Sequence, residues 1–398
     1  MSKFNNKLII CIVFALSVGL ISGCDNRIIK SNDSLYGGID AALGYNGLIS
    51  YRDDLLVYYD YNSGEATIFC SHPECEHERF NAVTNPNPKC PAVSPNGYKI
   101  LAAFMSENHL YMITQDDSAN SMMVYRADAN GENRKIIGVI SAETILNGYL
   151  IYNNLLIFTG AEMAYKETDD NLLGVAFSNI LSTWIIDLDT LDVVYKNPIK
   201  KIDYNIMYHV NNNILYYIYH DNETEIHEIK CVDLQTFSSL ESISIPKHAN
   251  NEYAYIVFYN ESGYYLIKNQ NEESVDVVKL NLIDHKHEIV LSELHIKGNS
   301  TLFSVVGDYY FINSVYEDTG SENNWQNYIY NSKDKQLYGV DMAYSGVETR
   351  FMSYFISADG EHMIFITFPG MQAEYRYMKI DDFIAKSSKY VDLKISLK

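Results

Sequence analysis

The 398-residue sequence has few positive charges, with 30 Lys and Arg residues against 51 Asp and Glu, which gives a formal charge of −21. It also has little proline, with 8 residues, and only 2 tryptophans. A chain this acidic, without a basic stripe, repels phosphate backbones, so nucleic acid is excluded as an expected partner. Beyond residue 23 no apolar run is long enough to span a membrane.

The sequence also lacks the short motifs that mark common active sites. It has no G-x-S-x-G elbow, no H-E-x-x-H, no nucleotide-binding glycine pattern and no D-x-[DN]-x-[DN]-G calcium loop. The carboxylate pairs Asp53-Asp54 and Asp116-Asp117 fall at turns, where Asp commonly bonds the backbone. We therefore expect no catalytic residues.

The composition is that of a folded β protein. Apolar residues make up 47% of the chain, enough for a large core, and 34 tyrosines accompany 16 phenylalanines. Aromatic residues are enriched in strands. The sequence therefore favours an all-β fold.

The N-terminus has the pattern of an export signal. Lys3 and Lys7 precede an apolar run from Leu8 to Leu20, which is too short to span a membrane comfortably. The run ends in Ile21-Ser22-Gly23-Cys24, which resembles the lipobox of bacterial lipoproteins.

The resemblance implies a signal peptide over residues 1–23 that is removed. It also implies acyl chains such as palmitate on Cys24, and a lipidated tether over 24–39. The alternative is an uncleaved N-terminal membrane anchor.

A unit of about 50 residues then repeats, in which a strand ends at an Asp or Asn turn. Successive copies are 68, 59, 46, 48, 50 and 50 residues apart. Their turn residues are Asp60, Asp128, Asp187, Asp233, Asn281, Asn331 and Asp381. A second turn followed by an aromatic-rich strand precedes each copy, at Leu56, Tyr111, Leu156, Leu215, Tyr265, Tyr310 and Ile364. Asn, Asp and Gly at these turns supply the positive φ that tight hairpins need.

This repeat predicts a β-propeller over residues 40–398. A four-stranded blade cannot bury both of its faces alone, so blades must pack around an axis. We predict seven blades of about 50 residues, with six or eight as alternatives. A β-sandwich should not repeat seven times, and a β-helix needs shorter coils.

Two turns add a resemblance to a known family. Ser94-Pro95-Asn96-Gly97 and Ser357-Ala358-Asp359-Gly360 resemble the Ser-Pro-Asp-Gly turn that joins two strands of a blade in TolB-like propellers. Asp128-Ala129-Asn130-Gly131 resembles the outer-strand turn of the same repeats. The likeness covers most of residues 40–390. It implies the fold and carries no catalytic residues across.

The first repeat step is about 20 residues longer than the mean of the later ones, which predicts an insert over residues 70–91 between blades one and two. The insert contains the pattern Cys-x-x-Pro-x-Cys-x-His, starting at Cys70, with a further cysteine at Cys90. The pattern is similar to one in propeller lipoproteins of clostridial Gram-positive bacteria.

Two chemistries compete in the insert. Three thiolates and one imidazole would satisfy a tetrahedral zinc ion, with Cys70, Cys75, His77 and Cys90 as ligands. The alternative is a disulfide from Cys90 to Cys70 or Cys75, since disulfides persist in exported proteins. Free thiols are a third possibility. Cys231 lies in mid-strand and is expected in the core.

A long acidic loop over residues 316–325 ends at Trp325. Loops on a propeller face commonly carry binding, so Trp325 with nearby Tyr328 is a candidate for stacking on a sugar or anchoring a peptide. The alternative is that Trp325 packs into the next blade.

These patterns favour a non-catalytic binding or scaffold protein, tethered by lipid to the extracytoplasmic face of the cell membrane. Its ligand would be a protein, a peptide or a carbohydrate. One alternative is an extracytoplasmic enzyme acting on polysaccharide or peptide. The other is a metal- or redox-responsive surface protein that uses the cysteine insert. No cofactor is expected apart from zinc in that insert.

Overall fold

The computed structural model describes residues 35–392 with gaps. The longer gaps are 117–120, 167–175, 200–207, 222–225, 247–255, 270–273, 318–322, 341–352, 357–361 and 368–373. Shorter gaps are 38–40, 44–46, 53–54, 386–388 and residues 62, 64, 71, 73, 143 and 297. The signal peptide, Cys24 and the tether up to residue 34 lie outside the described residues, so their assignments stay predictions. No described helix is long and apolar enough to cross a membrane.

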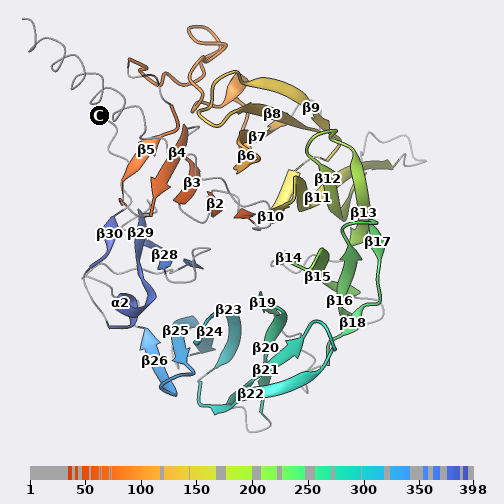
Figure 1. Ribbon diagram of the computed structural model, residues 1–398, viewed down its shortest axis with the longest axis vertical. Coiled ribbons are helices and arrows are strands. Elements are labelled where there is room, and N and C mark those ends of the chain that lie inside the picture. Colours follow the sequence, from red (N-terminus) through yellow and green to blue (C-terminus); the bar gives the residue numbers. More distant parts are fainter. Residues whose placement is uncertain are drawn as a thin grey trace, which may run out of the picture.

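The described strands form antiparallel sheets arranged in a ring (Figure 1). We call each run of four consecutive strands a blade and name it by its strands. Blade β6–β9 consists of β6 (Ile100–Ser106), β7 (His109–Asp116), β8 (Ser121–Asp128) and β9 (Lys135–Ile140). Blade β14–β17 consists of β14 (Tyr208–Asn211), β15 (Ile214–Asp221), β16 (Ile226–Asp233) and β17 (Ser238–Ser239), and β18 (Ile243–Ser244) also pairs with β16.

The C-terminal half contributes three more blades. Blade β19–β22 consists of β19 (Val257–Tyr259), β20 (Ser262–Lys268), β21 (Val275–Asn281) and β22 (His287–Leu294). Blade β23–β26 consists of β23 (Asn299–Val306), β24 (Tyr309–Glu317), β25 (Asn323–Asn331) and β26 (Gln336–Val340). Blade β27–β30 consists of β27 (Ser353–Ile356), β28 (His362–Thr367), β29 (Glu374–Lys379) and β30 (Val391–Asp392), with helix α2 (Ile380–Ile384) between its last two strands.

The sixth sheet has nine strands and combines two blades. Blade β2–β5 consists of β2 (Ala41–Leu43), β3 (Gly47–Arg52), β4 (Leu55–Asp60) and β5 (Ala66–Ile68). Blade β10–β13 consists of β10 (Thr144–Tyr152), β11 (Leu155–Lys166), β12 (Ala176–Asp187) and β13 (Val193–Ile199). Strand β1 (Leu35–Gly37) joins them by pairing with both β2 and β10. The all-β ring confirms the predicted fold. The count of seven blades stays a prediction, because one sheet merges two blades.

Consecutive residues on the second strand of a blade bury their side chains against opposite neighbours, because side chains alternate across a strand. On β15, Tyr217 belongs to a cluster shared with β11, whereas Tyr216 belongs to a cluster shared with β20. The same alternation separates Ile157 from Phe158, Tyr265 from Leu266, and Phe311 from Ile312. Burying each such side chain contributes roughly 1.5–3 kcal/mol. Each blade therefore completes its core only between two others, as the repeat predicted.

Ring closure depends on side chains. Blade β27–β30 contains only C-terminal strands, and it lies beside blade β2–β5 (Figure 1). The rings of Tyr61 and Tyr377, both buried, stack across this junction with their centroids 5.0 Å apart. Such a pair adds about 0.5–1.5 kcal/mol beyond its burial.

The predicted turn chemistry is present in the hairpins. Both residues of the first turn have positive φ at 107–108, 153–154 and 212–213. In the third-to-fourth strand turn, Asp187 Oδ1 accepts hydrogen bonds from the backbone N–H groups of Asp189 (2.8 Å) and Thr190 (3.1 Å). Equivalent bonds occur at Asp233 and Asn281. These local bonds fix where each hairpin turns.

The structure departs from three expectations. Pro95–Gly97 is a 3₁₀ turn, η1, that leads from the insert into β6, so it does not join two strands of a blade. Strands β24 and β25 extend into the predicted acidic loop and leave only 318–322 between them. Leu35–Gly37, at the end of the predicted tether, is strand β1. Strand pairing extends these elements further than turn residues alone suggest.

Candidate functional site

The cysteine insert leaves the end of β5 and lies on the outer side of the ring, between blades β2–β5 and β6–β9 (Figure 1). Between β5 and η1 the described residues contain no strand or helix, apart from isolated bridges between Asn81 and Asn85 and between Val93 and Leu55. Leu56 holds both ends of the insert. Its N–H donates to the Ala92 carbonyl (2.8 Å), and its carbonyl accepts from Phe69 N–H (2.9 Å). The short β5 leaves this edge of β4 open for the insert.

Four side chains converge inside the insert. The ligand atoms of Cys70, Cys75, His77 and Cys90 all lie within 4.8 Å of one another. His77 Nδ1 is 3.3 Å from Cys90 Sγ. Cys90 is buried and the other three are half-buried. The structure thus brings together the four predicted metal ligands, and all the cysteines it describes are free rather than joined in the alternative disulfide.

Local backbone geometry positions the two central donors. Cys75 N–H donates to the His72 carbonyl (3.2 Å), which closes a turn between Cys70 and Cys75. His77 has a φ of 51°, a left-handed conformation that costs a residue with a side chain roughly 1–2 kcal/mol. In this conformation the imidazole of His77 contacts Cys90, which is 13 residues further along the chain.

Blade β6–β9 holds the insert from the side through its β8–β9 turn. The Arg134 guanidinium donates to the carbonyls of Val93 (2.6 Å), Pro88 (3.0 Å) and Pro91 (3.4 Å). Gly131 in the same turn lies so close to Pro91 that a Cβ there would be 2.5 Å from the proline Cβ. The carbonyls on both sides of Cys90 are therefore fixed by a neighbouring blade.

Burial favours the protonated form of two thiols in the metal-free cluster. Burial, the largest cause, raises the pKa of Cys90 to about 12, and its neighbours Cys75 and Cys70 raise it too. Burial likewise raises the pKa of Cys70. A cation that binds here must therefore displace protons from thiols.

Four protein donors of this kind can fill a tetrahedral metal site completely. Closed sites with sulfur and nitrogen ligands are structural, whereas catalytic zinc sites keep one position for water or substrate. The cluster can therefore hold a metal such as zinc, and its donor set gives it no position for a substrate.

The remaining sequence candidates lie elsewhere. Cys231 is buried in mid-strand on β16, as expected. Tyr328 is half-buried on β25, packs against the core shared with blade β19–β22, and donates to Gln326 Oε1 (2.9 Å). Trp325 lies on the same strand, but its side chain is outside the described residues. Ligand binding by this pair stays a prediction.

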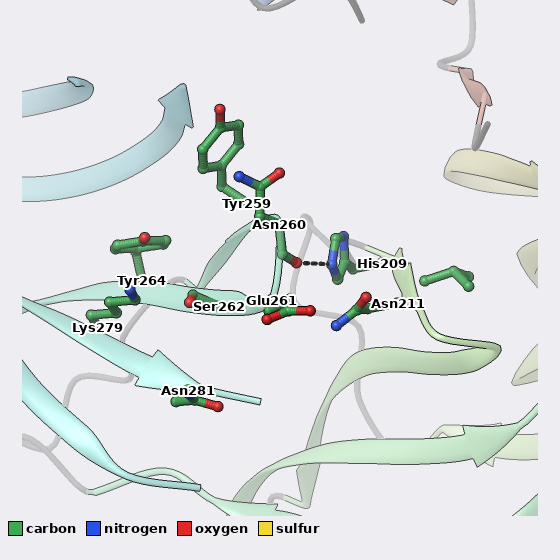
Figure 2. Close-up of a pocket in the computed structure, with 10 residues that line it drawn as sticks. His209, Asn211, Tyr259, Asn260, Glu261, Ser262, Tyr264, Lys279 and Asn281 are labelled. Atoms are coloured by element: carbon green, nitrogen blue, oxygen red, sulfur yellow. Dashed lines mark hydrogen bonds between the residues drawn. The ribbon is translucent and has the colours of Figure 1, made fainter. Parts of the chain in front are cut away.

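A pocket that the sequence did not predict lies between blades β14–β17 and β19–β22. It has a volume of about 740 Å³. Its lining residues are His209, Val210, Asn211, Tyr259, Asn260, Glu261, Ser262, Tyr264, Lys279 and Asn281. Figure 2 shows His209 and Asn211 on one side and the turn from Tyr259 to Ser262 facing them. These residues lie on β14 of one repeat and on β19–β21 and their first turn in the next repeat, and no motif in the sequence marks them.

His209 ties the two walls together. It is buried, its Nε2 donates to the Asn260 carbonyl (2.6 Å), and its ring stacks on Phe258 with centroids 5.4 Å apart. Burial lowers the pKa of His209, so the imidazole is neutral at pH 7. The charges at the pocket come instead from exposed Glu261 and half-buried Lys279. The negative charge of Glu261 and the positive charge of Lys279 cancel, so the pocket has no net charge.

No known protein family matches this chain, and no curated protein matches it. Solved structures do match. An oligogalacturonate lyase from Vibrio parahaemolyticus has a TM-score of 0.50 at 12% identity, over 86% of this chain and 90% of the lyase. The β-propeller domain of the Trilobed protease from Pyrococcus furiosus has a TM-score of 0.44 at 13% identity, over 71% and 81%. TolB from Acinetobacter baumannii has a TM-score of 0.39 at 11% identity, over 86% and 76%.

The chain is a β-propeller. Identities this low show the fold alone. The insert with its Cys/His cluster follows the first blade of this propeller, as predicted.

Proposed function

We propose that this propeller is a lipid-anchored, extracytoplasmic binding protein without catalytic activity, and that the pocket between blades β14–β17 and β19–β22 holds its ligand. The export signal and the Cys24 lipobox-like sequence support the anchor. The observation that carries the proposal is that strand β1, the first described element, begins at the end of the blades where the residues of this pocket lie.

The register of β1 gives this orientation. Leu35 pairs with Ile151 and Gly37 with Tyr149, so β1 begins beside the end of β10, where the turn 153–154 lies. The equivalent turns of the next two blades, 212–213 and 260–261, lie beside or within the pocket. In an antiparallel meander these first turns recur at the same end of every blade. Strand β1 therefore begins on the pocket face, which supports a tether attached at this face.

The tether also limits the distance to the membrane. The 11 residues from Cys24 to Leu35 extend at most about 40 Å. A pocket on this face is then held near the membrane surface, next to envelope polymers and the extracytoplasmic parts of membrane proteins.

The pocket lining favours a polar, uncharged or zwitterionic ligand. Asn211 and Asn260 offer amide groups, and Tyr259 offers an aromatic ring. Hydroxyl-rich sugars and peptide backbones use such groups for hydrogen bonding and stacking. The ligand class is therefore a carbohydrate or a peptide segment.

The anchor is tested by labelling cells that express the protein with an alkyne fatty acid. The wild type should carry the label, and the C24S variant should not. The control C231S, which removes a buried cysteine of the propeller, should keep it. Label that persists in C24S, or is absent from the wild type, would refute the anchor.

The pocket is tested by measuring binding of the purified protein to arrays of neutral oligosaccharides and of unstructured peptides. E261Q and K279M should weaken binding of any captured probe about tenfold, which corresponds to one lost charge-assisted hydrogen bond. The control K333M changes an exposed lysine on the β25–β26 turn and should bind normally. Equal binding by all three variants, or no captured probe, would refute this pocket as the binding site.

A further inference from the structure

The insert has almost no core of its own. Of its described residues 70–91, only Pro88, Cys90 and Pro91 are buried, and Val83 is 87% exposed. A segment with so little apolar burial cannot offset its loss of chain entropy by packing alone. It is held at its ends by Leu56 and at its side by Arg134. The central part of the insert needs another stabilising interaction, and the four converging donors lie in this part.

The cluster dimensions match a metal better than a disulfide. Zinc bonds of roughly 2.3 Å to sulfur and 2.0 Å to nitrogen place the atoms of a tetrahedron roughly 3.5–3.8 Å apart. The four donor atoms lie within 4.8 Å of one another, and the pair of His77 Nδ1 and Cys90 Sγ is 3.3 Å apart. Contraction by about 1 Å would complete the tetrahedron, whereas a disulfide would bring two sulfurs to about 2.0 Å and leave the third thiol and the imidazole unused.

We propose that the insert binds one structural zinc ion through four protein ligands: Cys70, Cys75, His77 and Cys90. Three thiolates and an imidazole are soft and borderline donors, which suit zinc and disfavour calcium and magnesium. The set is complete at four, so the ion cross-links the insert rather than performing chemistry. It is independent of the ligand pocket, which lies in other blades.

Charge and protons balance at this site. Zinc binds thiolates, so thiol protons are released to solvent on binding, whereas an imidazole binds through the ring nitrogen that carries no proton. Three thiolates and Zn²⁺ have a net charge of −1. The Arg134 guanidinium, fixed on the carbonyls that flank Cys90, places a positive charge beside this anion. Such surrounding groups typically change metal affinity 10–100-fold when they are mutated.

The test is metal analysis of the purified full-length protein by mass spectrometry after gel filtration. The wild type should contain one zinc per chain, and C75S and H77A should retain less than about a tenth of that. Two matched controls should keep the full content. H72A removes an imidazole that contacts Glu132, and C231S removes a buried cysteine on β16.

X-ray absorption on the wild type needs no variant and so covers the case in which C75S or H77A fails to fold. It should show three sulfurs at roughly 2.3 Å and one nitrogen at roughly 2.0 Å from zinc. Background zinc in the wild type, iron in place of zinc, a shell of oxygen ligands, or a disulfide within residues 70–90 in non-reducing peptide mapping would each overturn the proposal. Equal zinc loss in H72A and H77A would overturn it as well.

Discussion

Replacing Gly131 by alanine tests how the insert is held against blade β6–β9. Gly131 has a φ of +83°, and an added Cβ would lie 2.5 Å from the Pro91 Cβ. Gly307 is a matched control, because it also has positive φ (+55°) but has nothing within 4 Å of the position a Cβ would occupy. The two substitutions share the backbone penalty, and only G131A adds a collision with the insert.

The expected magnitudes follow from these two contributions. The left-handed conformation costs an alanine roughly 1–2 kcal/mol, and both variants gain similar stability from a less flexible unfolded chain. Overpacking against a fixed proline adds about 1–3 kcal/mol. G131A should therefore lose about 1–3 kcal/mol more free energy of unfolding than G307A.

Two assays measure this difference. Urea unfolding followed by tryptophan fluorescence gives the stability of each variant, and limited proteolysis gives the accessibility of residues 70–91. G131A should unfold at lower urea than G307A, and its insert should be cleaved faster. Equal midpoints and equal cleavage rates for G131A and G307A would refute the close packing of Pro91 on this turn.

Two further predictions concern Arg134 and Tyr208. R134M removes three hydrogen bonds to insert carbonyls and should lower the free energy of unfolding by about 2–4 kcal/mol, with R134K recovering only part because its single ammonium cannot span them. A wild-type urea midpoint for R134M would contradict this. Burial raises the pKa of Tyr208 from 10.0 to about 12. The neutral phenol therefore contributes fully to the free energy of unfolding below pH 10. This contribution is lost as the pH rises to 12, at about 1.4 kcal/mol per pH unit. The stability of Y208F should fall less steeply over this range; parallel pH profiles would rule the effect out.

The turns and the repeat were predictable because their causes are local. Asp187 and Asn281 bond the backbone two and three residues on, so the signal lies within a few positions of sequence. The interval between such turns then predicts the size of the blade. The longest of these intervals located the insert.

Long-range features were not predictable in this way. Pairing of β1 with β10 joins Leu35 to Ile151, and nothing near Leu35 in the sequence indicates that partner. The pocket joins the strand that contains His209 to the turn at Asn260, 51 residues away, and neither segment has a distinctive motif. Both features depend on how far each blade is rotated from the next.

The sequence by itself determined the all-β repeat, the place of the insert and the four residues able to bind a metal, because residue type and spacing carry that information. Only the tertiary structure decided that these four donors converge, that Arg134 of the next blade fixes their surroundings, and that a pocket opens between two blades. The physical reason is that spacing limits which groups can meet, whereas the packing of blade on blade determines which groups do meet.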